Sequence, residues 1–302
     1  MKPIKRILII RFRQIGDSIL AVALCSTLKK SFPDAEIHFV LNKNIAPLYE
    51  GHPDIDKVIT FDKNENKPFT AYIKKVWQVM HKNRYDVIID MRSTIRTLFF
   101  SLFSLRTPFR IGRIKGYTHF LLNYRTDTYS KNLTTDMVQR NLLLAAPLEK
   151  IRPIQYTKEF KLYLTDREKE DFRYYMEKEG IDFARPVLLI GVTTKLIHKK
   201  WNTEFMATLK RILEEYKDIQ MIFNYAPGYE EEDARNIYKE LGCPERIKID
   251  IQASSLRQLA ALCANCSFYF GNEGGARHIA QALGVPSFAI YYPRLRVLRM
   301  SK

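Results

Sequence analysis

Short apolar runs alternate with amphipathic stretches of helix length along almost the whole of this 302-residue chain. In the first half we expect strands at 6–10, 36–41, 58–61, 87–90 and 109–111, with helices near 18–31, 68–82 and 93–105. In the second half we expect strands at 187–192, 219–224, 247–249 and 268–270, with helices near 166–179, 203–215, 229–241 and 255–264. Strands that alternate with helices are typical of parallel sheets with helices on both faces. The predicted fold class is therefore α/β.

The stretch 147–160 interrupts this alternation and contains Pro147 and Pro153. Proline commonly marks a boundary between regular elements, and a chain of this length commonly forms about two domains. We therefore expect two doubly wound parallel-sheet domains, 1–150 and 151–302, with a ligand cleft between them. Such sheets bind ligands at the carboxyl ends of their strands.

Positive charge is concentrated in the first half of the chain. Residues 1–150 hold 25 Lys and Arg against 13 Asp and Glu, whereas residues 151–302 hold 24 against 20. The window 91–125 contains no acid, yet it carries seven aromatic residues and seven cations: Arg92, Arg96, Arg106, Arg110, Arg113, Lys115 and Arg125. This composition indicates a surface for an anionic partner, which could be nucleic acid, a membrane surface or a phosphorylated acceptor.

The sequence has no feature of a membrane-spanning or secreted protein. The longest apolar run, 98–105, falls far short of the ~20 residues that a transmembrane helix needs. The N-terminal run is followed by Arg11 and Arg13 with no small-residue cleavage site, which favours a first strand over a signal peptide. The four cysteines fit a reduced, cytoplasmic protein, and Cys263-x-x-Cys266 lacks the second pair of a zinc site. We expect no metal.

The first predicted strand leads into Gly16-Asp17, where the first helix should begin. Asp17 has two interpretations: a helix cap or first-turn acid stabilised by the helix dipole, or a general base displayed at the cleft. Arg11 and Arg13 lie just before it and could hold phosphate.

Hydroxyl and ammonium groups follow the strand predicted at 187–192. Thr193, Thr194 and Lys195 come directly after it, and Lys199 lies a few residues beyond. Such groups at the carboxyl end of a strand suit a diphosphate, although an ordinary polar loop has the same composition.

Residues 268–290 have the pattern strand, glycine turn, helix, strand. Gly271, Gly274 and Gly275 form the turn, and His278 lies on the helix after it. Glycine allows a ligand close to the backbone, and a helix N-terminus presents free N–H groups to an anion. The pattern indicates a site for a nucleotide or a nucleotide-sugar diphosphate.

These motifs occur in an order that resembles the bacterial heptosyltransferases of glycosyltransferase family 9, which build the lipopolysaccharide core. The resemblance covers nearly the whole chain and implies the GT-B fold, in which two Rossmann-like domains face a central cleft. It rests on Arg11 with Gly16-Asp17, Thr193-Thr194 with Lys199-x-Trp201, Ala226-Pro227 with Glu230-Glu231-Glu232, and Gly271-x-Glu273-Gly274-Gly275-x-x-His278.

The resemblance implies an inverting, metal-independent glycosyltransferase that moves heptose from ADP-heptose to the phosphorylated, Kdo-containing lipopolysaccharide inner core. Asp17 would be the catalytic base and Lys199 would stabilise the departing diphosphate. The nucleotide sugar is a co-substrate, and no further cofactor is implied. Donor contacts are expected at Thr193, Thr194, Lys195, Glu230, Gly271, Glu273, Gly274, Gly275 and His278. Acceptor contacts are expected at Arg11, Arg13, Arg92, Arg96, Arg110, Arg113 and Lys115.

The implied partner is an anionic glycolipid at the cytoplasmic face of the inner membrane. We therefore expect a monomer that is peripherally associated with this face, and we do not expect a nucleic acid partner. The chain departs from the family where Glu273-Gly274-Gly275 replaces the usual Asp-Thr/Ser-Gly. Two alternatives remain open: a related glycosyltransferase with a different nucleotide-sugar donor, and a non-catalytic polyanion-binding protein on the same scaffold.

Overall fold

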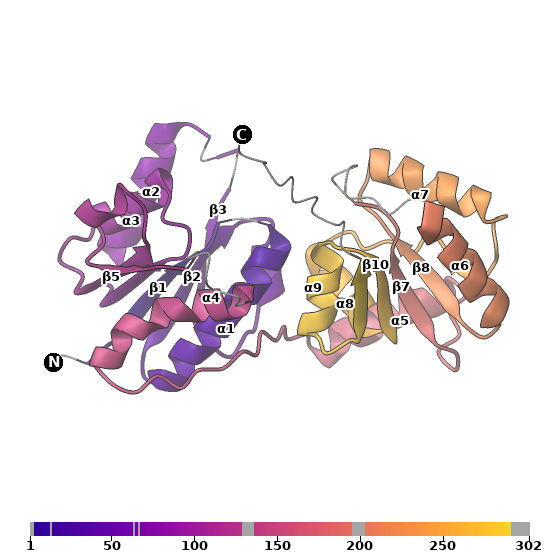
Figure 1. Ribbon diagram of the computed structural model, residues 1–302, viewed down its shortest axis with the longest axis horizontal. Coiled ribbons are helices and arrows are strands. Elements are labelled where there is room, and N and C mark those ends of the chain that lie inside the picture. Colours follow the sequence, from indigo (N-terminus) through magenta and orange to yellow (C-terminus); the bar gives the residue numbers. More distant parts are fainter. Residues whose placement is uncertain are drawn as a thin grey trace, which may run out of the picture. The chain divides into compact units, whose positions relative to one another are not determined.

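A computed structural model of the chain describes residues 3–12, 14–62, 64–65, 67–128, 136–194 and 203–290. The chain divides into two compact units, Met1–Tyr163 (unit 1) and Leu164–Lys302 (unit 2). Each unit is built on one parallel sheet with helices packed against it (Figure 1). The prediction of two doubly wound parallel sheets is confirmed. Within the described residues, no helix is both long enough and apolar enough to cross a bilayer.

Unit 1 contains a six-stranded sheet with the strand order β3-β2-β1-β4-β5-β6. Its strands are β1 (Arg6–Ile10), β2 (Glu36–Asn42), β3 (Lys57–Phe61), β4 (Val87–Asp90), β5 (Phe109–Arg113) and β6 (Tyr124–Thr126). The central strands β1 and β4 are apolar except for the first residue of β1, Arg6, and the last residue of β4, Asp90, and every residue after Arg6 is buried. Such runs are typical of strands covered on both faces.

In the described part of unit 1, four α-helices cover this sheet: α1 (Ile15–Ser31), α2 (Phe69–Lys82), α3 (Ile95–Leu102) and α4 (Met137–Leu142). Helices α2 and α3 share one core with the sheet, in which Tyr72, Val76 and Phe100 pack with Phe61. Helix α1 packs against α4 (Figure 1), where Ala23 meets Val138 and Leu142. The described residues of this unit also form the 3-10 helices η1 (Ala46–Tyr49), η2 (Thr118–Phe120) and η3 (Leu143–Lys150).

The segment that follows η3 is held on unit 1 by hydrogen bonds to α1. The Thr27 hydroxyl donates to the Thr157 carbonyl at 3.2 Å and accepts from the Thr157 N–H at 3.1 Å. The Ser31 hydroxyl accepts from the Gln155 N–H at 2.9 Å. The units therefore divide after Tyr163, whereas the proline pattern placed the division at residue 150.

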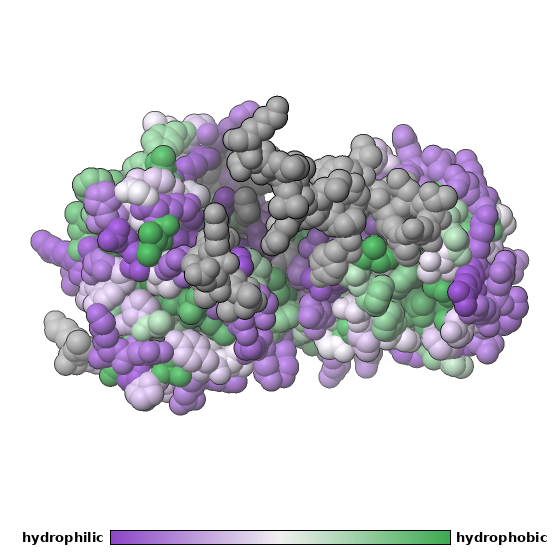
Figure 2. All heavy atoms as spheres, in the orientation of Figure 1, coloured by the Kyte–Doolittle hydropathy of each residue, from purple (hydrophilic) through white to green (hydrophobic). Residues whose placement is uncertain are grey.

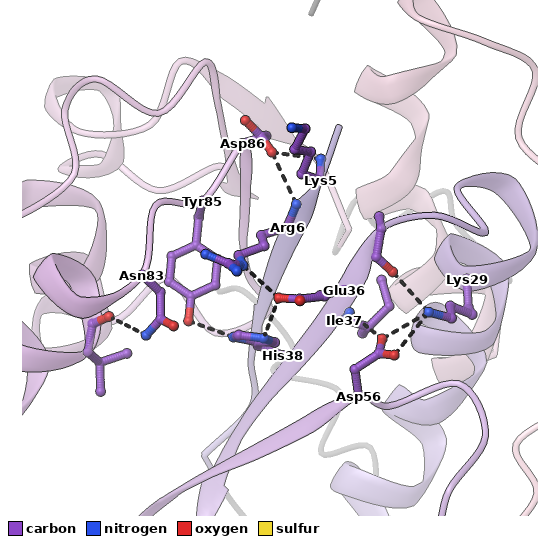
Figure 3. A network of polar contacts seen from close by, with 12 residues as sticks. Lys5, Arg6, Lys29, Glu36, Ile37, His38, Asp56, Asn83, Tyr85 and Asp86 are labelled. Atoms are coloured by element: carbon purple, nitrogen blue, oxygen red, sulfur yellow. Dashed lines mark hydrogen bonds and ion pairs between the residues drawn. The ribbon is translucent and has the colours of Figure 1, made fainter. Parts of the chain in front are cut away.

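Polar contacts close the amino-terminal edge of the unit 1 sheet (Figure 3). Glu36, the first residue of β2, accepts a hydrogen bond from Arg6, the first residue of β1, at 2.6 Å. His38 lies 3.4 Å from Glu36 and 2.9 Å from the Tyr85 hydroxyl. Asp86 accepts from the backbone N–H of Arg6 at 3.1 Å. These contacts help to align the strands at this edge. The loops that carry the candidate site lie at the opposite, carboxyl-terminal edge.

Unit 2 contains a five-stranded sheet with the order β11-β10-β7-β8-β9. Its strands are β7 (Val187–Gly191), β8 (Gln220–Asn224), β9 (Ile247–Lys248), β10 (Phe268–Asn272) and β11 (Ser287–Ile290). Its helices are α5 (Asp166–Lys178), α6 (Thr203–Glu215), α7 (Tyr229–Glu240), α8 (Leu256–Ala264) and α9 (Gly275–Ala282). Helices α6 and α7 share one core with the sheet, and α8 packs against both α5 and α9.

Candidate active site

Each sheet has one point where the strand order reverses. In unit 1 this switch point lies between β1 and β4, and in unit 2 it lies between β7 and β10. At such a point the loops that leave two neighbouring strands turn to opposite faces, which opens a crevice where ligands bind. The sequence-predicted residues follow these four strands, so we describe the two switch points in turn.

Asp17 lies in the first turn of α1, directly after β1. Gln14 is the N-cap of this helix, so Asp17 is a first-turn acid and not the cap. Its Oδ1 atom lies 3.0 Å from Nη2 of Arg11, and its side chain is 26% exposed. The helix dipole favours a negative charge at this position. The fold therefore presents a solvent-accessible carboxylate at the switch point of unit 1.

Arg11 joins this carboxylate to the neighbouring strand. Its guanidinium donates to the Met91 carbonyl at 3.4 Å and is almost fully buried. Met91 follows β4, on the other side of the switch point. Arg11 thus holds Asp17 and the loop after β4 in one arrangement.

A buried aspartate shapes the loop after β4. Asp90 is fully buried, and its Oδ1 atom accepts from the backbone N–H of Arg92 at 3.0 Å and of Ser93 at 2.7 Å. Burial raises the pKa of the Asp90 carboxyl above its ordinary value. Ser93 has a φ of 48°, a conformation that non-glycine residues seldom adopt, and Asp90 helps to hold it there.

The loop after β5 contacts the loop after β4. The Ser93 hydroxyl accepts from the Arg113 N–H at 2.8 Å, and the Tyr117 hydroxyl donates to the Ser93 carbonyl at 3.0 Å. Lys115 donates to the Arg92 carbonyl at 2.9 Å. Four of the predicted acceptor residues, Arg11, Arg92, Arg113 and Lys115, therefore gather at the carboxyl-terminal edge of β1, β4 and β5.

The other predicted acceptor residues lie elsewhere or outside the described residues. Arg96 lies on α3 with its guanidinium 4.8 Å from the centre of the Tyr72 ring. Arg110 donates to the carbonyls of Leu105, Thr107 and Leu121, so it ties loops around β5 and does not join the four. Arg13 lies outside the described residues.

In unit 2, the residues after β7 meet the first turn of α7. The buried Thr193 hydroxyl donates to Oε2 of Glu230 at 2.7 Å. The Tyr229 hydroxyl donates to the Thr194 carbonyl. The structure thus brings together three predicted donor residues, Thr193, Thr194 and Glu230. The predicted Lys195 and Lys199 lie outside the described residues.

The end of β10 packs closely against the end of β7. Gly271 pairs with Gly191 and has a φ of +138°; a Cβ atom on it would lie 2.5 Å from the Gly191 carbonyl oxygen. The buried Asn272 side chain donates to the carbonyls of Gly191 at 3.0 Å and Val192 at 3.2 Å. Gly271 is therefore required by strand packing, whatever the ligand.

Helix α9 begins immediately after this turn. Gly274 is its N-cap, with an extended φ of −167° and no side-chain cap, and a Cβ atom there would meet open space. Gly275 is the first helical residue, and His278 lies in the first turn, half-buried. Glu273 is exposed beside them. The first N–H groups of α9 lack intrahelical partners, as at any helix start, and can bind an anion.

Candidate metal ligands have other roles or lie apart. Within the described residues, no three His, Cys, Asp or Glu side chains are grouped so as to hold a metal ion. Cys263 and Cys266 are buried free thiols, and burial raises the pKa of both.

Sequence reasoning did not find Asp90, Ser93, Tyr229 or Asn272. In the sequence, Asp90 is the last residue of a predicted buried strand, and no local pattern predicts its hydrogen bonds to the turn that follows. Asn272 acts on residues 80 and 81 positions away. For Asp90 and Asn272 the available signal was their location as the last residue of a strand, the place where α/β sheets carry functional groups.

Comparisons with known proteins identify the family of the chain and its fold. Residues 73–296 match glycosyltransferase family 9 (heptosyltransferase). Lipopolysaccharide heptosyltransferase 1 of Campylobacter coli is 23% identical over 292 residues, which cover 95% of this chain and 83% of that protein. Lipopolysaccharide core heptosyltransferase OpsX of Haemophilus influenzae is 23% identical over the same share of this chain and 79% of its own length.

Two solved structures show the same fold. The family 9 glycosyltransferase from Veillonella parvula superposes with a TM-score of 0.81 at 17% identity, over 96% of this chain and 82% of that one. The E. coli heptosyltransferase WaaC with ADP-2-deoxy-2-fluoro heptose superposes with a TM-score of 0.71 at 17% identity, over 95% and 89%.

Two parallel sheets of Rossmann order, each with polar loops at its switch point, define a protein of the GT-B class. The family match covers most of the chain: it begins within α2 of unit 1 and extends to residue 296 in unit 2. The chain belongs to glycosyltransferase family 9, the heptosyltransferase family, and is a glycosyltransferase.

Proposed function

We propose that this protein transfers heptose from ADP-heptose to a phosphorylated, Kdo-containing acceptor of the lipopolysaccharide inner core, with inversion and without a metal ion. Its curated relatives are named as lipopolysaccharide heptosyltransferases, and one structural neighbour was solved with an ADP-heptose analogue. The observation that carries the proposal is the ion-paired, partly exposed Asp17 at the switch point of unit 1.

Unit 2 binds the donor in this proposal. Thr193 and Glu230 are hydrogen-bonded at the end of β7 and offer a hydroxyl and a carboxylate to the nucleotide. The N-terminus of α9, after the glycine turn, stabilises negative charge on the departing diphosphate. Lys195 and Lys199 add ammonium groups to the same loop, and His278 adds a ring nitrogen. These cations and helix N–H groups perform the charge stabilisation that a metal ion performs in other transferases.

Unit 1 binds the acceptor and supplies the base. Asp17 accepts the proton of the attacking sugar hydroxyl, and a single displacement inverts the anomeric carbon. Arg92 and Lys115 lie beside the buried Arg11 and Arg113 and give this edge a strong positive potential. Such a potential attracts the phosphates of the inner core. Arg13, four residues before Asp17 in the sequence, joins them in this proposal.

The acceptor is carried by a lipid, so we propose that the monomeric protein works at the cytoplasmic face of the inner membrane. The net charge of +16 favours association with an anionic surface.

A second donor is favoured by one observation. Gly274 replaces a hydroxyl residue of the family pattern, and the structure leaves open space where that side chain would be. A nucleotide sugar that does not need this hydroxyl would be accepted equally well. Parallel assays with ADP-heptose and with other ADP- and GDP-sugars decide between the donors.

Asp17→Asn tests the base. The substitution keeps the size of the side chain and its place beside Arg11 but removes the proton acceptor, so turnover should fall by about 10²- to 10⁴-fold. Binding of ADP-heptose, followed by thermal shift, should persist because the donor binds to unit 2. Asp34→Asn, at an exposed acid after α1, is the matched control and should retain full turnover. Unimpaired turnover in Asp17→Asn would remove Asp17 from the mechanism.

A further inference from the structure

Arg11 carries its charge inside unit 1. Hydrophilic residues cover much of the surface of this unit (Figure 2), but Arg11 is only 4% exposed. A buried guanidinium is costly unless an anion pairs with it and hydrogen bonds satisfy its donors. Asp17 supplies the anion, with Oδ1 3.0 Å from Nη2, and the Met91 carbonyl accepts from Nη1 at 3.4 Å. The buried charge therefore depends on both the first turn of α1 and the loop after β4.

A second arginine makes the reciprocal contact. Arg92, in the loop after β4, donates from Nη1 to the carbonyl of Phe12, the residue after Arg11, at 3.1 Å. Arg11 in turn donates to the carbonyl of Met91, the residue before Arg92. At the switch point of unit 1, each of the two loops therefore contributes an arginine that binds a backbone carbonyl of the other loop. We name these two contacts the arginine clasp.

Both loops of the arginine clasp are fixed by further contacts. The Phe12 ring packs edge-to-face against Phe61, with ring centres 5.2 Å apart. The backbone N–H of Arg11 donates to the Val40 carbonyl at 3.0 Å. In the other loop, the buried Asp90 accepts the backbone N–H of Arg92 at 3.0 Å. Side chains held on such fixed loops can place a catalytic group to within about 0.5 Å, the precision that catalysis requires.

Exposure distinguishes the roles of Arg11 and Asp17. The Asp17 side chain is 26% exposed and the Arg11 side chain 5%, so an acceptor can reach the carboxylate but very little of the guanidinium. Oδ1 of Asp17 lies beside Arg11, whereas Oδ2 has no hydrogen-bonding partner among the described residues. One carboxylate oxygen is held and the other remains to accept a proton, as in sites where a third group orients the base.

We propose that Arg11 is a positioning residue for Asp17 and not the acceptor ligand expected from the sequence. Through the arginine clasp, Arg11 holds the carboxylate in the orientation in which it takes the proton of the attacking hydroxyl. The clasp also makes this orientation depend on the loop after β4, which carries Arg92. The inference rests on the proposed function, in which Asp17 is the base.

Steady-state transfer kinetics compare the wild type with Arg11→Met, Arg11→Lys, Asp17→Asn and the double variant of Arg11→Met with Asp17→Asn. Methionine keeps a flexible apolar stem in the buried site but removes the charge, whereas lysine keeps the charge without the fork of donors. Arg246→Met is the control, because the Arg246 guanidinium donates to three backbone carbonyls in unit 2 and pairs with no carboxylate among the described residues. Circular dichroism and urea unfolding check that each variant is folded.

Arg11→Met should lower kcat by about 10- to 100-fold, the loss expected of a misplaced catalytic group, and leave the KM for the acceptor within about twofold. Arg11→Lys should have a kcat at least about threefold above that of Arg11→Met, because an ammonium group can still pair with Asp17. In the Asp17→Asn background, Arg11→Met should change kcat by less than about twofold, because the base that it positions is already absent. Arg246→Met should keep kcat and KM within about twofold of the wild type.

Three kinetic results would overturn the proposal. The first is a kcat of Arg11→Met equal to that of the wild type. The second is a raised KM for the acceptor with unchanged kcat, which would make Arg11 an acceptor ligand. The third is an equal loss of kcat in the wild-type and Asp17→Asn backgrounds, which would mean that Arg11 supports the loops without acting through Asp17.

A crystal structure of Arg11→Met separates this inference from the proposed function. The Asp17 carboxylate should move by about 1 Å or more from its wild-type position, a displacement large enough to impair catalysis, whether or not the protein transfers heptose. A carboxylate that stays in place would overturn the positioning role. A displaced carboxylate, together with unimpaired turnover in Asp17→Asn or no heptosyl transfer in the wild type, would refute the proposed function and leave the positioning of Asp17 by Arg11 intact.

Discussion

Asp90 should stabilise unit 1 as a hydrogen-bond acceptor and not as a charge. Its Oδ1 atom accepts the N–H groups of Arg92 and Ser93, and the Ser93 bond lies in buried surroundings. Asp90→Ala leaves both donors without this acceptor. A buried, unsatisfied N–H costs about 1–3 kcal/mol, and the partly buried Arg92 N–H costs less, so the expected loss is about 2–4 kcal/mol. Asp90→Asn keeps an oxygen in the same place and should cost below about 1 kcal/mol.

Urea unfolding of the two variants and the wild type measures these differences. The slope of the unfolding free energy against urea should be unchanged, since the substitution removes a local contact and not the cooperativity of the unit. A loss of this size corresponds to roughly 5–15 °C in the melting temperature of a unit of this length. Equal stability of the alanine and asparagine variants would refute the assignment of Oδ1 as the acceptor that holds this loop.

The pH dependence of the same pair tests the cost of burying the charge. Burial raises the pKa of Asp90 above its ordinary value of 3.8, so the folded state binds the proton more tightly than the unfolded state does. The stability that this proton contributes is complete below pH 3.8 and is lost as the pH rises through the raised value. The wild type should therefore lose stability relative to Asp90→Asn as the pH rises. A difference of the opposite sign would mean that Asp90 is stabilised as a carboxylate.

Two further predictions concern unit 2. Gly271→Ala should destabilise this unit by about 2–5 kcal/mol, because a φ of +138° is strained for alanine and the Cβ atom would clash with the Gly191 backbone. Gly274→Ala should be nearly neutral, because Gly274 has an extended φ and open space around it. Equal unfolding curves for the two variants would contradict this prediction. Arg257 lowers the pKa of Glu168 to about 2, so this ion pair contributes stability above pH 4.5 that is lost as the pH falls through about 2. Arg257→Met should be less stable than the wild type at neutral pH, and acid titration should show the difference shrinking toward pH 2; a constant difference would refute the pairing.

The sequence predicted most of the fold because buried parallel strands leave a strong local signal. The run Ile7–Ile10 is apolar throughout, and each such strand alternates with a helix that has one apolar face. The signal failed where elements are short. Strand β6 (Tyr124–Thr126) has three residues that are not buried, and helix α4 (Met137–Leu142) has six, so neither shows a clear period.

The candidate site was predicted only in part for a related reason. Asp17 and Thr193 follow strands directly, so their positions at the carboxyl-terminal edge could be inferred from chain order. Ser93 owes its role to the Arg113 N–H, twenty positions away, and that contact depends on the pairing of β4 with β5. The charge of Arg110 led us to predict an acceptor contact, and no local pattern indicated that its guanidinium donates to three loop carbonyls.

The glycines after β10 separate what the fold requires from what the ligand requires. Gly271 lies against the Gly191 backbone at the switch point, so any protein with this strand pairing needs a glycine there, and its presence says nothing specific about the donor. Gly274 is different, because neither its φ nor its surroundings exclude a side chain. Where the fold does not restrict the residue type, the residue present depends on ligand binding or on neutral evolutionary drift. Introducing serine at Gly274 is therefore the more informative change for identifying the donor. Tighter binding of ADP-heptose by Gly274→Ser would identify a lost phosphate or sugar contact, whereas weaker binding would show that this chain accepts a donor that fills the open space.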